Sequence, residues 1–199
     1  MKKIILVILI FAFNFSFGQN KFNKSDAEKF QTTINTEYAD SKTSPLMADD
    51  LKTFKSLDFY PVNAKYFVIA KLVKARNEKA FEMKTSTSRK PKYIKYATAF
   101  FTINGVSLKL NVYQDVELSK SDKNKDYLFL PFSDKTCGKE SYIGGKYIDL
   151  KIPKGKTIAI DFNQSYNPYC AYNRKYSCPI VPLENDLNIE IKAGVKNFH

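Results

Sequence analysis

The spacing of apolar residues along this chain changes once, near residue 60. Before that point, Phe30, Ile34 and Tyr38 recur at the spacing of one helix face, which predicts an amphipathic helix from Asn23 to Asp40. A second short helix is expected to start at Pro45, since proline suits the first turn of a helix. Both helices are expected to pad the core rather than to bind a ligand.

After that point the period shifts towards two, which is typical of strands. Alternation, or a composition rich in β-branched and aromatic residues, predicts strands at residues 66–74, 81–84, 93–103, 106–114, 127–130, 147–152, 157–162 and 187–193. Asn104-Gly105 lies between two of these runs and favours the positive φ angles of a type I′ turn, which predicts a hairpin. About seven or eight short strands predict an all-β fold, an antiparallel barrel or sandwich, with an N-terminal helical arm.

The first residues begin with two lysines, continue as an apolar run and end with small residues, as in a cleaved export signal. The apolar run is short for a membrane span, which needs roughly 20 residues. We therefore expect a signal peptide at 1–18, a helical arm at 19–57, and a β domain at 58–199 that contains a long loop at 161–186. The protein is predicted to be periplasmic or secreted, with no transmembrane segment after cleavage. The open alternative is an uncleaved membrane anchor.

The chain is strongly basic, with a formal net charge of +12, or +10 without the two lysines of the export signal. Such an excess suits nucleic acid, anionic lipid or acidic polysaccharide. Only three of the 32 basic residues are arginines, which bidentate phosphate recognition prefers, and an exported protein rarely meets nucleic acid. We therefore predict no nucleic-acid partner. A lysine-rich bias explains the charge, with attraction to an anionic envelope surface as the alternative.

Histidine is nearly absent, since His199 at the chain end is the only one. This excludes His-based triads, multi-histidine zinc sites and most histidine general-base chemistry. Asp161, Asn163 and Glu184 offer oxygen ligands for calcium, but their spacing matches no known calcium loop. No metal and no cofactor is predicted.

The segment from Asp161 to Asn185 holds two cysteines, four tyrosines, four asparagines and three prolines. Prolines remove backbone donors and fix φ, so this segment is expected to be a shaped loop rather than a helix or strand. Strands at both ends would hold it rigidly, and ordered loops of this kind often carry function. Its tyrosines either stack on a sugar or another flat ligand, or pack the loop onto the sheet.

The cysteines of this loop favour a disulfide between Cys170 and Cys178, given an oxidising compartment. A reduced pair with a redox or thiol–metal role is the alternative. Cys137 is left over and is expected to be a buried or free thiol, because no base can be assigned to it.

Three other features offer weaker signals. The paired glycines within Tyr142–Tyr147 permit a bulge or a close approach of a ligand. The segment Thr85–Lys95 combines hydroxyls with basic groups, which suits either a cradle for a carboxylate or phosphate or an exposed connection. Asp134 and Glu140 are a possible acid/base pair, although a loop of this length sets neither their distance nor their pKa values.

Several motifs carry a family resemblance. They are F-L-P-F-S-D-K-T at 129–136, E-S-Y-I-G-G-K-Y-I-D at 140–149, D-F-N-x-x-Y-N-P-Y-C-A-Y-N at 161–173, D-F-Y-P at 58–61 and I-K-A-G-V-K at 191–196. Together they resemble the uncharacterised bacterial family called domain of unknown function 1684, over nearly the whole chain after the signal. The resemblance implies no activity. Lys146 stands where this family typically has Arg, which weakens a bidentate anion clamp, and Cys137 stands where a small polar residue is expected.

The leading hypothesis is a binding module of the cell envelope, whose long loop and neighbouring glycines line a polar and aromatic pocket for an unknown small molecule or an envelope glycan. The candidate ligand-binding residues are Gly144, Gly145, Lys146, Tyr147, Asp161, Asn163, Tyr166, Asn167, Tyr172, Asn173, Glu184 and Asn185. One alternative is a histidine-free, hydrolase-like enzyme with Asp161 or Glu184 as general base. The other is a purely structural envelope protein.

Overall fold

The structure is a computed structural model that describes residues 21–199, so the predicted signal peptide lies outside the described residues. Its main element is one eight-stranded, largely antiparallel sheet. The strands are β1 (Phe67–Lys74), β2 (Phe81–Glu82), β3 (Lys92–Ile103), β4 (Val106–Asp115), β5 (Tyr127–Asp134), β6 (Lys146–Lys151), β7 (Thr157–Asp161) and β8 (Asp186–Leu187). The predicted all-β fold is confirmed.

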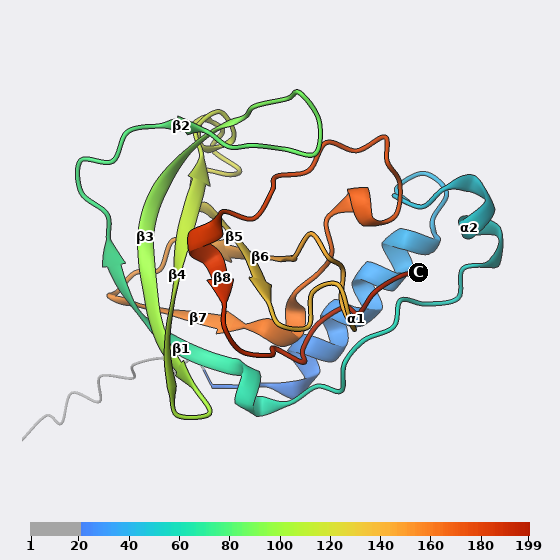
Figure 1. The fold of residues 1–199 in the computed structure, drawn as a ribbon, viewed down its shortest axis with the longest axis horizontal. Coiled ribbons are helices and arrows are strands. Elements are labelled where there is room, and N and C mark those ends of the chain that lie inside the picture. The colour runs from blue at the N-terminus through green and yellow to red at the C-terminus, as the bar shows by residue number, and fades with distance from the viewer. Residues whose placement is uncertain (1–20) are drawn as a thin grey trace, which may run out of the picture.

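The main path of the sheet follows the order β6-β5-β4-β3-β1-β7, while β2 pairs with β3 and β8 pairs in parallel with β5. The sheet curls, so that its end strands β6 and β7 come near each other and enclose an interior (Figure 1). The predicted hairpin joins β3 and β4. Asn104 and Gly105 have φ angles of 52° and 78° and form its two-residue turn.

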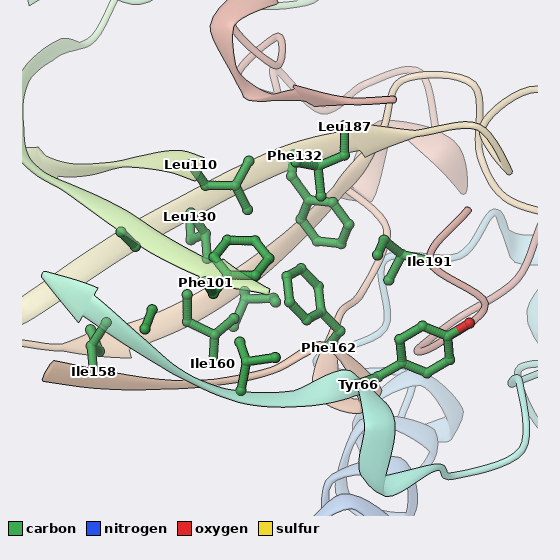
Figure 2. Packing of buried hydrophobic residues seen from close by; sticks show 14 of the residues in the cluster. Tyr66, Phe101, Leu110, Leu130, Phe132, Ile158, Ile160, Phe162, Leu187 and Ile191 are labelled. Carbon is green, nitrogen blue, oxygen red and sulfur yellow. The ribbon is translucent and has the colours of Figure 1, made fainter. Parts of the chain in front are cut away.

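The interior of the curled sheet is a core of aliphatic side chains and phenylalanines (Figure 2). Phe132 and Phe162 meet edge to face, with their ring centroids 5.1 Å apart. Alternate side chains of a strand point to opposite faces, so Leu128, Leu130 and Phe132 of β5 all reach this core. We call this side of the sheet the inner face.

Two helices precede the sheet, α1 (Lys24–Ala39) and α2 (Ala48–Thr53). The face of α1 predicted from the sequence is buried, and its Ile34 and Tyr38 pack with Tyr172 of the long loop. The chain after β8, residues 188–199, is called the C-terminal segment; it contributes Val195 and Phe198 to this cluster and ends near the helices (Figure 1). The second helix begins at Ala48 rather than at Pro45.

The predicted strand at 187–193 is wrong beyond its first residue, because β8 ends at Leu187. The alternation that suggested it is real, since Leu187 and Ile191 are buried and Ile189 is partly buried. The backbone finds its hydrogen-bond partners elsewhere. The amide of Ile191 donates to a carboxylate of Asp134, 3.2 Å away, instead of to a neighbouring strand.

Candidate functional site

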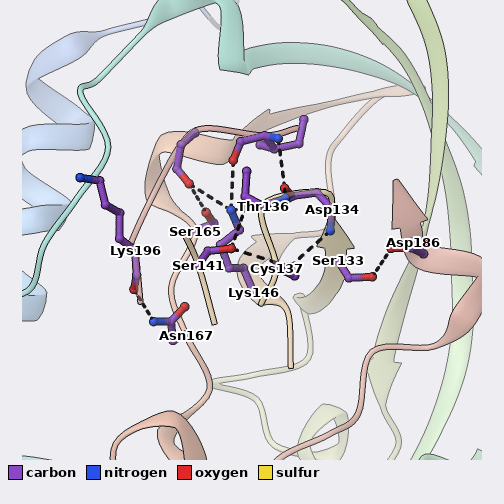
Figure 3. Close-up of polar contacts among 12 residues, drawn as sticks. Ser133, Asp134, Thr136, Cys137, Ser141, Lys146, Ser165, Asn167, Asp186 and Lys196 are labelled. Atoms are coloured by element: carbon purple, nitrogen blue, oxygen red, sulfur yellow. Dashed lines mark hydrogen bonds and ion pairs between the residues drawn. The ribbon is translucent and has the colours of Figure 1, made fainter. Parts of the chain in front are cut away.

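The most deeply buried charges of the site region are Asp134 at the end of β5 and Lys146 at the start of β6. Both side chains are 0% exposed, and Lys146 Nζ lies 3.1 Å from Asp134 Oδ2. The ammonium also donates to the carbonyl of Ile191 at 3.1 Å, while Asp134 Oδ1 accepts from the amides of Thr136 and Ile191 (Figure 3). We call this arrangement the Asp134–Lys146 clamp. It holds the C-terminal segment against the inner face.

The clamp shows that Asp134 and Glu140, suggested as an acid/base pair, do not act together. Lys146, predicted to bind a ligand, instead forms an ion pair with Asp134 and donates hydrogen bonds to backbone carbonyls. Glu140, the suggested acid/base partner of Asp134, forms an exposed ion pair with Lys192 at 2.7 Å. Asp134 and Glu140 therefore have different cationic partners, one buried and one at the surface.

The asparagines of the long loop bind backbone groups. Asn163 accepts from the amide of Asn63 at 2.9 Å and donates to its carbonyl at 3.1 Å. Asn185 does the same with Asn111, at 2.8 Å for both bonds. Asn167 donates to a carbonyl of the C-terminal segment at 2.8 Å. A side-chain amide offers the same donor and acceptor as a peptide group, so these residues tether the loop to the rest of the fold.

Three other candidates serve local turns or an exposed contact. Asp161 accepts from the side chain of Gln164 at 3.0 Å, and Asn173 accepts from the amide of Lys175 at 3.1 Å. Glu184 is exposed and accepts from a tyrosine hydroxyl of β4 at 3.1 Å. Within residues 21–199, no three His, Cys, Asp or Glu side chains lie close enough together to hold a metal ion.

The paired glycines allow a close approach of the chain to itself. Gly145 has a φ of +84°, and a Cβ at this position would lie 2.6 Å from the carbonyl oxygen of Phe132 on β5. A Cβ on Gly144 would lie 2.5 Å from the ring of Tyr142. Only glycine fits at Gly145 without strain, and this position sets where β6 begins and therefore where Tyr147 points.

A pocket of about 510 Å³ lies between α1, the outer face of the sheet and the long loop. Its aromatic wall residues are Phe30, Tyr38, Tyr93, Tyr127, Phe129, Tyr147, Tyr166 and Tyr169. Tyr127 and Phe129 alternate with the core-facing residues of β5, as Tyr147 and Asp149 do on β6, so strand geometry directs them all outward. We call this space the aromatic pocket.

Within residues 21–199, Asp149 on β6 is one of two carboxylates that line the aromatic pocket, the other being Glu37 on α1. The hydroxyls of Tyr127 and Tyr166 both donate to Asp149 Oδ1, each at 2.7 Å. Burial raises the pKa of both phenols, and the charge of Asp149 raises them further, so both stay protonated donors. Asp149 is exposed, and within the part of the chain that the structure describes its Oδ2 accepts no hydrogen bond.

The rim of the pocket is closed by two segments distant in sequence. Arg89, from the predicted basic connection, donates to the carbonyl of Ser177 at 2.8 Å and to its hydroxyl at 3.2 Å. The hydroxyl of Tyr147 donates to the carbonyl of Pro179. Residues 85–89 thus fasten the long loop over the outer face of the sheet.

The predicted disulfide is not formed, since Cys170 and Cys178 are free thiols. The amide of Cys170 donates to Cys178 Sγ at 3.2 Å. A hydrogen bond from the Cys178 thiol, assisted by the Tyr142 hydroxyl, lowers the pKa of Cys170 to about 6, and the same contact together with burial raises the pKa of Cys178. Closeness in sequence does not fix the geometry that a disulfide needs. Cys137 is also a free thiol, half-buried beside Asp134.

Two tyrosines of the loop line the pocket, and the other two pack against neighbouring rings. Tyr166 and Tyr169 line the aromatic pocket. Tyr172 is buried and packs edge to face on Tyr38 of α1, with ring centroids 5.0 Å apart, and Tyr176 packs against Tyr169. Among the predicted ligand-binding residues, Tyr147 and Tyr166 line this pocket.

Sequence reasoning missed the floor of the pocket, which Tyr127, Phe129 and Asp149 form. A signal was present in the two-residue spacings of Tyr127 with Phe129 and of Tyr147 with Asp149. Combining them requires the strand register, which sets Phe129 opposite Asp149. That register is a long-range property, and the hydrophobic pattern of either strand does not reveal it.

The family model described as "Protein of unknown function (DUF1684)" matches residues 52–196. The chain belongs to this family, which confirms the resemblance. The strands and loop of the aromatic pocket lie within the matched range of DUF1684, whereas α1 precedes it.

Among solved structures, the chain is similar to an uncharacterised protein of Haloarcula marismortui determined by solution NMR. The two are 29% identical, with a TM-score of 0.67, over 86% of this chain and 92% of the other. No curated protein matches the chain. Between residues 21 and 199, none of the helices has the length and apolar character to span a bilayer.

Proposed function

We propose that this protein is a small-molecule-binding module of the cell envelope, and that its ligand occupies the aromatic pocket. The pocket itself carries the proposal. Its volume of about 510 Å³ falls within the range of roughly 300–1,000 Å³ that is usual for ligand sites. It also combines flat apolar walls with a few convergent polar groups, as such sites do.

The contrast with close packing supports binding over a purely structural role. Protein interiors are packed about as densely as organic crystals, and the inner face of this sheet is filled with apolar side chains. On the outer face, rings from α1, from the strands and from the loop leave an open volume between them. A loop that served only to cover the sheet would be expected to close that volume.

The enzyme alternative receives less support. Its suggested bases, Asp161 and Glu184, do not line the aromatic pocket. Asp161 borders a neighbouring hollow of about 340 Å³ that shares Tyr127 and Asp149 with the pocket, but its oxygens are taken up by Asn163 and Gln164. Binding is therefore the preferred function.

The envelope location rests on the N-terminal pattern of the sequence. Export with cleavage near Gly18 predicts a mature chain that begins near Gln19. Mass spectrometry of the protein recovered from cells would show this start. A full-length chain that still carries its first residues would contradict export with cleavage and would favour the membrane-anchor alternative.

A pocket-filling variant tests binding. Thr33 is exposed on α1 and lines the aromatic pocket, so Thr33→Trp is expected to fill it without disturbing the core. Thr32 is exposed on the same helix and does not line the pocket, so Thr32→Trp is the matched control. In an NMR fragment screen, ligands that shift the resonances of Tyr127 and Tyr147 should bind the wild type and Thr32→Trp but not Thr33→Trp. Failure of every fragment to shift these resonances would favour a structural protein.

A further inference from the structure

The charges that line the aromatic pocket differ from those of the chain as a whole. The 32 basic residues include 29 lysines, yet none of the lysines within residues 21–199 lines this pocket. Its charged residues are Asp149, Glu37 and Arg89. Within residues 21–199, neither Asp149 nor Glu37 has a basic group within 4.0 Å, whereas Arg89 is engaged by Ser177. In a strongly basic protein, this pocket keeps two unpaired carboxylates.

We propose that the ligand is a small organic cation, an ammonium group carried on a compact apolar body. This inference rests on the proposed binding function and names its ligand class. The faces of aromatic rings attract a cation placed within about 6 Å of the ring centre, and quaternary ammonium ligands are bound in such aromatic cages. Tyr127, Tyr147 and Tyr166 provide such rings, and Asp149 lies among them.

The hydrogen bonds of Asp149 orient it for this role. Both phenol hydroxyls donate to Oδ1, which restricts the movement of this oxygen, while Oδ2 accepts no hydrogen bond from residues 21–199. Hydrogen bonds to an ionised group are stronger than those between neutral groups, so the pair of tyrosines holds the carboxylate in one place. The ammonium would therefore meet a charge that is already oriented, which reduces the entropy cost of binding.

An anionic ligand fits the same walls less well. Its charge would face Asp149 and Glu37, which line the pocket, and like charges brought close together repel. Among the described residues, Arg89 is the one basic side chain that lines the pocket, and its Nε and Nη2 already donate to Ser177. An anion would therefore have to displace Ser177 from the Arg89 guanidinium.

Two ligands of the same shape and different charge separate these possibilities. Choline and 3,3-dimethylbutan-1-ol differ by a quaternary nitrogen in place of a carbon. In NMR titrations of the mature chain, choline should bind about 10-fold more tightly than the alcohol, a difference of about 1.4 kcal/mol. Its shifts should map to Tyr127, Tyr147 and Tyr166.

Variants test the role of the carboxylates. Asp149→Asn should weaken choline about 10-fold and leave the alcohol unchanged, while Asp122→Asn, which removes an equal charge from an exposed position, should change neither. Glu37→Gln, on the exposed side of α1, should weaken choline a few-fold, which keeps the test open if Asp149→Asn fails to fold. Equal affinities for choline and the alcohol, or tighter binding of acetate than of choline, would overturn the proposal of a cationic ligand but not the proposal that the pocket binds a small molecule. Absence of binding by any of these probes and by every fragment would overturn both proposals.

Discussion

The two faces of the β5–β6 pair each carry an aspartate, and the two aspartates have opposite surroundings. Asp134 points to the inner face, where it is fully buried and bound to Lys146. Asp149 points to the outer face, where it is exposed to solvent, lines the aromatic pocket and is held by two tyrosine hydroxyls. Both lie on neighbouring strands of one sheet, so strand position alone decides which face each reaches.

The difference between the two aspartates suggests a division of roles: the inner face of the sheet contributes to stability, and the outer face forms the proposed binding site. A buried carboxylate must be paired, because an unpaired buried charge is costly, and the Asp134–Lys146 clamp uses its pair to hold the C-terminal segment. A carboxylate on the edge of a pocket needs no cation of its own. On this account, changes in the clamp lower stability and changes at Asp149 lower affinity.

The largest effect is expected from the clamp. Lys146→Met leaves Asp134 buried without its cation and should lower the free energy of unfolding by about 3–5 kcal/mol. Urea denaturation would measure it, with Lys135→Met as the control, because Lys135 is exposed beside the clamp. A loss below about 1 kcal/mol would show that Asp134 is satisfied without Lys146 and would remove the contrast between the two faces.

The second largest loss of stability is expected at the start of β6, where Lys146 faces the inner side and Tyr147 the outer side of the sheet. Gly145→Ala places a Cβ against a carbonyl of β5 at a positive φ, and such strain costs on the order of 1–3 kcal/mol. Gly155→Ala is the matched control, because a Cβ there meets nothing within 4 Å. Thermal unfolding should separate the two variants. Equal midpoints would mean that the approach of the two strands is not required.

A smaller effect is expected at the outer face. Tyr166→Phe removes one of the two hydroxyls that hold Asp149. Because this bond is exposed to solvent, its loss should lower the free energy of unfolding by only about 1 kcal/mol, less than a buried bond to a charged group would. The effect of the substitution on choline affinity should be a few-fold, since the remaining tyrosine still orients the carboxylate. If affinity is unchanged while stability falls by several kcal/mol, Asp149 belongs to the structural scaffold and the comparison fails.

The loop thiols give a pH-dependent signal that reports on the pocket wall. Since the pKa of Cys170 is lowered to about 6, its thiolate forms as pH rises through that value. Alkylation by iodoacetamide, followed by mass spectrometry at each cysteine, should increase up to about pH 7 and then level off. Cys178, whose pKa is raised and which is buried, should stay unmodified. Tyr142→Phe should move the Cys170 midpoint to higher pH, and a Cys170 rate that keeps rising past pH 8 would contradict the assignment.

Local patterns predicted the elements of this fold well. Strand-typical composition marked β1, and Asn104-Gly105 marked the turn between β3 and β4, because both signals depend on near neighbours. The failures have the opposite origin. Residues 187–193 have the pattern of a strand, but the side chains of Asp134 and Lys146 replace the strand that would have paired with them.

The candidate site shows the same limit. The asparagines of the loop were predicted to meet a ligand, and three of the four bind backbone groups remote in sequence, as Asn185 does with Asn111. Asp149 was not singled out, because its importance depends on Tyr127 and Tyr166, which only the folded sheet and loop bring to it. The amino-acid composition was enough to predict the long loop, whereas the aromatic pocket became visible only once the pairing of β5 with β6 was known.

A crystal structure of the mature chain with choline would test the central claim most directly. The account predicts that the quaternary nitrogen lies within about 6 Å of the ring centres of Tyr127, Tyr147 or Tyr166, beside Oδ2 of Asp149. Choline bound outside the aromatic pocket, or a pocket closed by its own side chains at saturating choline, would contradict it.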